Sequence, residues 1–148
     1  GTIIPVTSGA AWSGTTRIGP YAAAKGAIFS LMIVLANEIK PYNVNVNCLS
    51  PGFTQTRIVD DFVADIKEST GKSEAEIRGL VGSAQPPYNM APLAVFLSSD
   101  EGHDITGKVF QVSGDRITVI SSAHPGDSYV KTGGWTVDDL FASFPRSL

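Results

Sequence analysis

The pattern that most constrains the fold is an apolar strand, a long apolar helix and a second apolar strand, joined by short connections. The first strand pattern covers residues 2–7, the helical pattern residues 21–40 and the second strand pattern residues 44–49. Units of this kind place their strands parallel in one sheet with a right-handed crossover. The sequence therefore predicts an α/β fold built on a parallel sheet.

The same alternation continues after residue 56. Helical patterns cover residues 58–68, 74–81 and 90–97, and a third strand pattern covers residues 108–112. Ser73, followed three residues later by Glu76, predicts a capping box at the start of the helix at residues 74–81. We expect the first two helices to form a movable lid, because such segments exclude water from a reaction site.

The pattern decays after Gly114. Residues 116–120 are compatible with one more strand, and residues 124–134 are rich in Gly, Asp and Ser, which favours a surface segment. Residues 135–144 are interpreted as a docking helix whose apolar residues would enter a groove: Trp135, Leu140, Phe141 and Phe144.

The helix predicted at residues 21–40 is apolar on both sides. Its spacing predicts a core-facing stripe of Ala24, Ile28, Leu31, Met32, Leu35 and Ile39. The opposite side would carry Phe29, Ile33 and Ala36, and no charge occurs from Gly26 to Asn37. Burial within one domain would explain this, but we favour packing on a second subunit, as a homodimer or homotetramer.

Composition narrows the class of partner. In 148 residues the net charge is −3, and no Lys/Arg cluster supplies a basic field, so we expect no nucleic-acid partner. The uncharged run within the long helix is too short to span a bilayer, so we expect no membrane partner. The single cysteine, Cys48, lies in a strand pattern and suggests a reducing, cytoplasmic location.

Candidate chemistry begins with Tyr21 and Lys25. Four residues apart on a helix, their side chains project from the same face as neighbours, and a cation beside a phenol favours the phenolate. The pair can therefore exchange a proton with an alcohol or a ketone, although Tyr and Lys at this spacing also occur together by accident. Ser8 and the pair Pro51-Gly52 lie at the carboxyl ends of predicted parallel strands, where ligands bind in such sheets.

These features together resemble the C-terminal half of a short-chain dehydrogenase/reductase. The resemblance rests on the order and spacing of four features. Residues 6–8 end a strand, and Tyr21, with Lys25 four residues after it, follows Ser8 by 13 residues. Pro51-Gly52 follow the next strand, and residues 105–107 precede the last strand. It covers residues 1–114 and is similar, more loosely, to 3-oxoacyl reductases and 3-hydroxyacyl dehydrogenases. Residues 115–148 would be an extension packed on the domain or on a neighbouring subunit.

The resemblance implies an NAD(P)-dependent oxidoreductase that interconverts an alcohol and a ketone. It implies Ser8, Tyr21 and Lys25 as catalytic residues, with NAD or NADP as cofactor. The expected cofactor-binding residues are Tyr21, Lys25, Pro51, Gly52, Thr54 and Thr56. It implies a Rossmann-type doubly wound parallel sheet, and no metal.

Two expectations concern what the pattern lacks. The family's Gly-rich turn after a first strand is absent, as is the asparagine on the preceding helix, so we expect the N-terminal βαβ half to be missing and this fragment alone to be inactive. The chain also opens directly on a core-like strand, which indicates a truncated sequence.

Substrate and alternatives remain open. Bulky or apolar residues near the predicted crevice suggest a hydrophobic alcohol or ketone, including one with an acyl chain: Ala10, Trp12, Ile18 and Phe53. Trp12 and Phe53 can equally be packing residues. Ser8 as a nucleophile with His103 or His124 is disfavoured, because no nucleophile elbow surrounds it and both histidines lie in polar segments typical of a surface. A non-catalytic fragment that acts only in subunit association is the other alternative.

Overall fold

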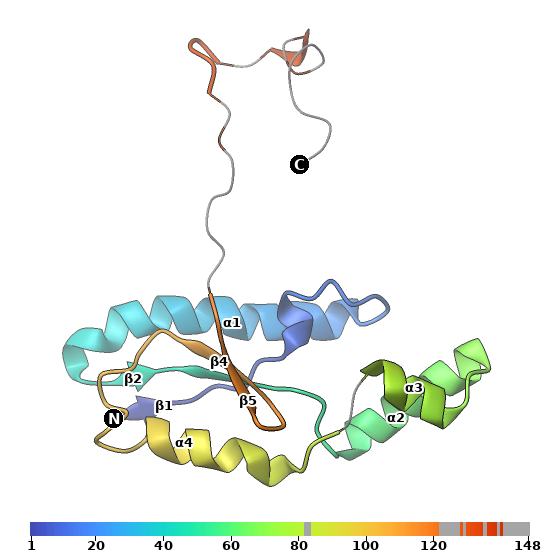
Figure 1. Ribbon diagram of the computed structural model, residues 1–148. Coiled ribbons are helices and arrows are strands. Elements are labelled where there is room, and N and C mark those ends of the chain that lie inside the picture. The colour runs from blue at the N-terminus through green and yellow to red at the C-terminus, as the bar shows by residue number, and fades with distance from the viewer. Residues whose placement is uncertain (82–83, 122–127, 129, 135, 139, 141–148) are drawn as a thin grey trace.

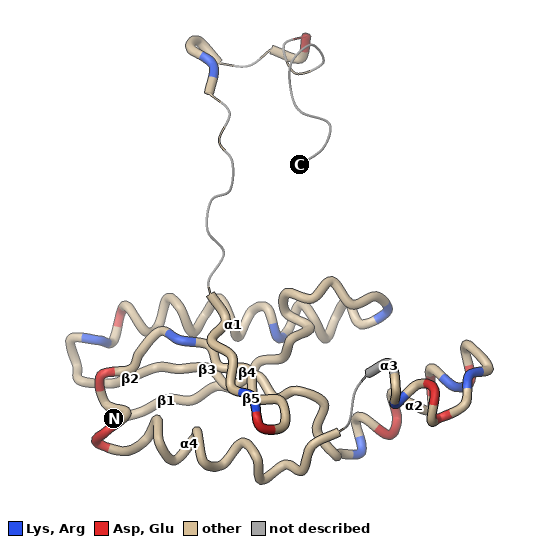
Figure 2. The backbone as a smooth tube through the Cα atoms, in the orientation of Figure 1, with Lys and Arg blue, Asp and Glu red and all other residues tan. Residues whose placement is uncertain are grey.

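The computed structural model describes residues 1–81, 84–121, 128, 130–134, 136–138 and 140. Within them the chain forms a small α/β body with one long helix and a projecting helical pair (Figure 1). The lysines and arginines and the aspartates and glutamates of the body are concentrated in the projecting pair and in the turns, while the middle of the long helix carries none (Figure 2).

The strands form one layer from two hydrogen-bonded pieces. Strand β1 (Thr2–Ile3) pairs in parallel with β2 (Asn45–Val46). Strand β3 (Cys48–Pro51) pairs in parallel with β4 (Val109–Ser113), which pairs antiparallel with β5 (Arg116–Ile120). A parallel bridge between Val6 and Leu49 joins the two pieces. The parallel sheet predicted from the sequence is confirmed, and residues 116–120 are a strand.

The first strand is shorter than predicted. Only Thr2–Ile3 is regular strand, and the chain pairs again at Val6. Pro5 lies in the gap and has no amide hydrogen to donate to a neighbouring strand, although its carbonyl accepts from the Leu49 amide at 3.0 Å. The predicted strand at residues 44–49 is likewise divided, with Asn47 lying between β2 and β3.

Helices cover both faces of this layer. Helix α1 (Gly19–Ile39) lies on one face and the short helix α4 (Ala91–Leu97) on the other (Figure 1). Pro20 stands at the first turn of α1, where its missing amide hydrogen costs nothing. Single 3₁₀ turns, η1 (Gly9–Ala11), η2 (Lys40–Tyr42) and η3 (Pro87–Met90), lead into or out of these helices.

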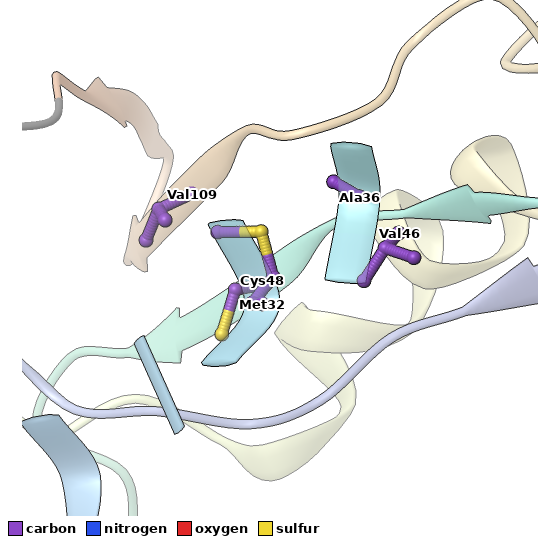
Figure 3. Close-up of a cluster of buried hydrophobic side chains, with 5 residues drawn as sticks. All are labelled: Met32, Ala36, Val46, Cys48 and Val109. Atoms are coloured by element: carbon purple, nitrogen blue, oxygen red, sulfur yellow. The ribbon is translucent and has the colours of Figure 1, made fainter. Parts of the chain in front are cut away.

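Each face has its own apolar core because successive strand residues point to opposite sides. On the α1 side the buried cluster is Met32, Ala36, Val46, Cys48 and Val109 (Figure 3). On the α4 side it is Leu49, Leu93, Leu97, Phe110 and Val112. The two-sided covering confirms the doubly wound α/β class.

The faces of α1 differ from the prediction. Phe29 and Ile33 were expected on the outer side with Ala36, but Ala36 is buried and the other two pack against the α1-side cluster. Leu31 was expected inside and is 62% exposed, while Val34 is 51% exposed. A helix that lies on a broad sheet buries a wide face. The predicted core-facing stripe left out Phe29 and Ile33, which contact the core, and included Leu31, which does not. The exposed apolar stripe of α1 consists instead of Ala24, Ala27, Leu31 and Val34.

Helices α2 (Arg57–Thr70) and α3 (Glu74–Val81) project beyond the carboxyl ends of the strands (Figure 1). They pack on each other through buried Val63 and Ile77 and are joined by an exposed ion pair between Arg78 and Asp60 at 3.1 Å. The predicted capping box is confirmed: Glu76 Oε2 accepts from the amide and hydroxyl of Ser73, and Ser73 Oγ accepts from the Glu76 amide. These contacts lower the pKa of the Glu76 carboxyl, chiefly through the hydrogen bond from the Ser73 hydroxyl.

Asparagine side chains fasten the amino ends of β2 and β3. Asn47, fully buried, donates to the Ile105 carbonyl at 2.6 Å and accepts from the Lys108 amide at 3.1 Å. Asn45 donates to the carbonyl of His103, and the His103 ring contacts Asn43 Oδ1 at 2.8 Å. His103 is therefore half-buried in a structural network close to the surface, which agrees with its non-catalytic interpretation. His124 lies outside the described residues.

The predicted docking helix at residues 135–144 falls largely outside the described residues, which include neither Trp135, Phe141 nor Phe144. Leu140 is described and is 42% exposed. Whether this segment enters a groove stays a prediction.

One helical stretch among the described residues, Gly19–Tyr42, is long and apolar enough to cross a membrane by length and composition. That test is weak evidence, since the core helix of a soluble protein passes it as well. The inner face of α1 packs against the sheet, which explains the apolar residues on that face, while Leu31 and Val34 on the other face stay exposed.

Candidate active site

The predicted catalytic and cofactor residues gather at the carboxyl ends of the parallel strands. The Thr7 amide donates to the Leu49 carbonyl at 2.8 Å, which fixes Ser8 one residue beyond this pairing. Pro51 ends β3, and the Gly52 amide donates to the Val112 carbonyl at 2.7 Å. Ser8 and Gly52 therefore leave neighbouring strands at the same edge of the sheet, as predicted.

Ser8 is the N-terminal cap of the turn η1. Its backbone is extended, and its Oγ accepts from the Ala10 amide at 3.3 Å. That bond uses Oγ as an acceptor only, so the hydroxyl hydrogen stays available to a substrate oxygen. Ser8 is half-buried, so part of its surface is open to solvent.

Tyr21 and Lys25 stand one helical turn apart at the start of α1. The Lys25 Nζ lies 5.8 Å from the centre of the Tyr21 ring and donates to the Val6 carbonyl at 3.0 Å. The buried Thr7 hydroxyl donates to the Lys25 carbonyl at 2.7 Å. These two bonds tie the first turns of α1 to the strand that carries Ser8, so all three residues are held by one junction. Tyr21 itself is 44% exposed.

The segment after β3 is held close to β4. A side chain at Gly52 would collide with the Ser113 hydroxyl and crowd the Val112 carbonyl, so a larger residue there would require Ser113 to move. Thr54 Oγ1 donates to the Gly52 carbonyl at 2.9 Å, and Thr56 Oγ1 donates to the Thr54 carbonyl at 3.3 Å. Each of these bonds leaves the hydroxyl oxygen free to accept a further hydrogen bond.

The four predicted substrate residues lie at three places in the fold: at η1, at the start of α1 and beside α2. Trp12 packs on Phe29 with ring centres 5.7 Å apart, which fastens η1 to α1, and Ala10 lies within that turn. Phe53 packs on Phe62 of α2 at 6.1 Å. Ile18 precedes α1 and accepts the Ala22 amide through its carbonyl. The contacts of both aromatic residues support packing roles for them, whatever else they do.

In the part of the chain that the structure describes, no histidine lies beside Ser8 to act as the base of a serine hydrolase. His103 is tied to Asn43 and Asn45 at the amino ends of the strands, opposite the end where Ser8 lies. Among the residues that the structure describes, no group of three or more His, Cys, Asp or Glu side chains could hold a metal ion.

Sequence reasoning missed Gln85. It is buried, and its backbone pairs with the segment after β3: its amide donates to the Phe53 carbonyl and its carbonyl accepts from the Gln55 amide, both at 2.8 Å. Its side-chain amide donates to the Val112 carbonyl at 2.7 Å and accepts from the Gly114 amide at 2.6 Å. No sequence pattern marks Gln85, since the residues around it indicate only a break before Pro86-Pro87.

Comparison with known proteins identifies the class. A family model described as enoyl-(acyl carrier protein) reductase matches residues 1–114. The chain is 32% identical over 114 residues to the 3-oxoacyl-(acyl-carrier-protein) reductase FabG of Chlamydia trachomatis, covering 77% of this chain and 44% of that protein. The chain belongs to the short-chain dehydrogenase/reductase family, as the resemblance of its motifs predicted.

Solved structures of short-chain dehydrogenases have the same fold as this chain. A short-chain dehydrogenase from Mycobacterium avium superposes with a TM-score of 0.71 at 33% identity, covering 95% of this chain and 40% of that one. A proposed NAD(P)-dependent gluconate 5-dehydrogenase from Beutenbergia cavernae, whose structure holds NADP, gives a TM-score of 0.64 at 32% identity over 75% of this chain and 43% of that one. The chain thus spans less than half the length of these relatives.

Proposed function

We propose that residues 1–114 are the C-terminal half of the catalytic domain of an NAD(P)-dependent oxidoreductase that interconverts an alcohol and a ketone. The observation that carries the proposal is the junction of Ser8, Tyr21 and Lys25, held together by the bonds of Lys25 to Val6 and Thr7. Residues of these types, held at one sheet edge, can move a proton and stabilise a developing charge on a substrate oxygen.

Each side chain has a distinct part. Tyr21 Oη gives the proton to the carbonyl oxygen of a ketone or takes it from the hydroxyl of an alcohol. Ser8 Oγ donates a hydrogen bond to the same substrate oxygen and stabilises its charge. Lys25 Nζ, near the Tyr21 ring, provides the positive charge that favours loss of the phenol proton.

The residues around Gly52 fit a nicotinamide cofactor. The absence of a side chain at Gly52 lets this segment lie close against β4, where the Ser113 hydroxyl fills the space that a Cβ would take. Thr54 and Thr56 have acceptor capacity left for a carboxamide, and Lys25 has two ammonium hydrogens beyond the one given to Val6 for ribose hydroxyls. The nicotinamide supplies the hydride donor or acceptor. The relative from Beutenbergia cavernae, with NADP in its structure, supports NAD or NADP here.

The substrate is a small alcohol or ketone with apolar character. Ala10, Trp12, Ile18 and Phe53 supply apolar surface around the crevice, and the chlamydial relative, a 3-oxoacyl reductase by name, makes an acyl chain a reasonable substrate. The buried single cysteine agrees with a reducing, cytoplasmic setting.

Changing Tyr21 to Phe tests the proposal in the protein as it occurs, with whatever sequence flanks residues 1–148. We expect turnover to fall by roughly 10²–10⁴-fold, because only the proton path is removed, with cofactor affinity nearly unchanged. Turnover is followed by nicotinamide absorbance with a panel of ketones that includes a 3-oxoacyl thioester. Retained activity in the variant would overturn the assignment of Tyr21, and a wild type that binds neither NADH nor NADPH would favour the non-catalytic alternative.

We further propose that the exposed stripe of α1 pairs with a second copy of the chain, in a homodimer or homotetramer. Leu31 and Val34 are more than half exposed, and no charge occurs on this helix between Lys25 and Glu38 (Figure 2). Burial of such side chains contributes roughly 1.5–3 kcal/mol each, and a two-fold contact uses the same patch twice.

Replacing Leu31 and Val34 together with Glu should split this assembly, because the paired helices would bring like charges into a desolvated contact. Ile58→Glu is the matched control, since Ile58 is 72% exposed but lies on α2. Sedimentation velocity at micromolar concentration measures the result. A monomeric wild type, or an Ile58→Glu variant that dissociates equally, would contradict the role of α1.

A further inference from the structure

Gln85 occupies a junction of three chain segments. The first is the segment from Gly52 to Thr56, the second is the chain arriving from α3, and the third is the end of β4. Gln85 is 5% exposed, although glutamine is a residue that prefers water. Both ends of its side-chain amide are satisfied within the protein, so its burial is matched by specific partners.

The backbone of Gln85 closes the base of the lid formed by α2 and α3. Its amide and carbonyl pair with Phe53 and Gln55 on the chain entering α2, and a parallel bridge joins Gln85 to Thr54. The exposed Gln55 side chain adds a bond to the Ala84 carbonyl at 3.1 Å. The chain therefore leaves the sheet before α2 and returns to it after α3 at the same place, where residues 53–55 pair with Gln85. Helices α2 and α3 project from this pairing.

The side chain of Gln85 connects this base to the sheet. Its Nε2 donates to the Val112 carbonyl, the same oxygen that accepts from the Gly52 amide, and both distances are 2.7 Å. Its Oε1 accepts from the Gly114 amide at 2.6 Å and from Asn89 at 3.4 Å. The Val112 carbonyl of β4 thus accepts hydrogen bonds from both Gly52, at the start of the Gly52–Thr56 segment, and Gln85, after helix α3.

We propose that Gln85 is a positioning residue that fixes the Gly52–Thr56 segment and the lid base against β4, and so sets cofactor affinity without touching the reacting atoms. This role rests on the proposed function of that segment. Loss of the amide frees the lid base from β4 and leaves the Gly114 amide without its partner, while Ser8, Tyr21 and Lys25 keep their own junction. The expected signature is weakened cofactor binding with the chemical step largely retained.

Gln85→Met tests this, because methionine keeps nearly the same length and volume but makes none of the amide's hydrogen bonds. In the intact protein we expect the dissociation constant for NADH or NADPH to rise by about tenfold, and kcat at saturating cofactor to change by less than about threefold. Hydrogen exchange of the amides of α2, α3, Gln55 and Gly114 should accelerate, with α1 and β3 unchanged. Gln55→Met is the matched control, a glutamine at the same lid base whose side chain has no bond to β4.

The outcomes separate the inference from the proposed function. Unchanged exchange of the lid and of Gly114 in Gln85→Met, or an equal effect of Gln55→Met, overturns the role of Gln85 even if the enzyme is active. Accelerated exchange without cofactor binding by the wild type supports the fastening while removing the proposed function. If Gln85→Met does not fold, Gln85→Glu carries the test: it keeps an acceptor for Gly114 and loses the donor to Val112, so a smaller acceleration in the same segments is expected.

Discussion

The two ends of the parallel strands use polar side chains in opposite ways. At the amino ends, Asn45 and Asn47 are buried and their amides bond to the chain itself. At the carboxyl ends, Ser8 and Tyr21 are partly open to solvent and keep bonding capacity for a ligand. The same sheet thus separates buried polar groups that are bonded within the fold from partly exposed polar groups with bonding capacity left.

The comparison gives a rule for judging candidate residues. A buried polar group costs free energy unless it is bonded, so a fully partnered asparagine is explained by the fold alone. A partly exposed hydroxyl or ammonium is solvated by water, so its hydrogen-bonding groups stay available to a ligand. Gln85 is a buried, fully partnered side chain of the first kind, although it lies at the carboxyl ends of the strands.

The largest expected effect at the carboxyl ends, after that of Tyr21, follows from Lys25→Met. Removing a charged donor should weaken cofactor binding by roughly 10–100-fold, because hydrogen bonds to charged groups contribute about 1.5–3 kcal/mol. Fluorescence titration with NADH and NADPH measures this in the intact protein. Lys40→Met, at the other end of the same helix, is the control and should leave affinity unaltered. An unaltered affinity in Lys25→Met would remove the ribose contact from the proposal.

Substitutions at the amino ends of the strands should instead change the free energy of unfolding. Asn47→Ala leaves the Ile105 carbonyl and the Lys108 amide without their partner, which should cost about 1–3 kcal/mol in the free energy of unfolding. Urea denaturation should show a lower midpoint, while cofactor affinity of the folded fraction stays the same. Asn37→Ala, an exposed asparagine on α1, should change stability by less than about 0.5 kcal/mol. A loss of cofactor affinity in Asn47→Ala would break the division between the two ends.

The smallest effect concerns the capping box of α3. The pKa of Glu76 is lowered by the Ser73 hydroxyl and amide, so the contact stabilises α3 above the ordinary carboxyl pKa and is lost as pH falls through the lowered value. Amide exchange in α3, corrected for its intrinsic pH dependence, should accelerate slightly at acid pH and in Ser73→Ala. The side-chain bonds of Asn47 at the amino ends join backbone groups alone and should not follow this change. Equal acid sensitivity of both regions would contradict the assignment to Glu76.

Sequence reasoning recovered the elements whose cause is local. Helices α2 and α3 follow from amphipathic spacing and from the Ser73 and Glu76 cap. The strands predicted at residues 108–112 and 116–120 follow from apolar runs between turns. Residues that combine in one junction, such as Ser8, Tyr21 and Lys25, were found because their spacing and order carry a family pattern.

The rest depended on three-dimensional contacts that no spacing encodes. The orientation of α1 is set by which side chains fit the sheet, and periodicity alone assigned Leu31 inward and Phe29 outward. His103 is held by asparagines some 60 positions earlier in the chain, and Gln85 binds a strand 27 positions later. Such pairings appear only once the chain has folded.

The length of α1 carries a consequence for any assembly built on it. With 21 residues the helix is about 30 Å long, and Tyr21 stands at one end while the exposed Leu31 and Val34 lie beyond its middle. A two-fold axis perpendicular to the helix would make the paired copies antiparallel, so their crevices would open at opposite ends of the shared contact. Each copy would then admit its substrate from its own side, and neither active centre would borrow a side chain from the other.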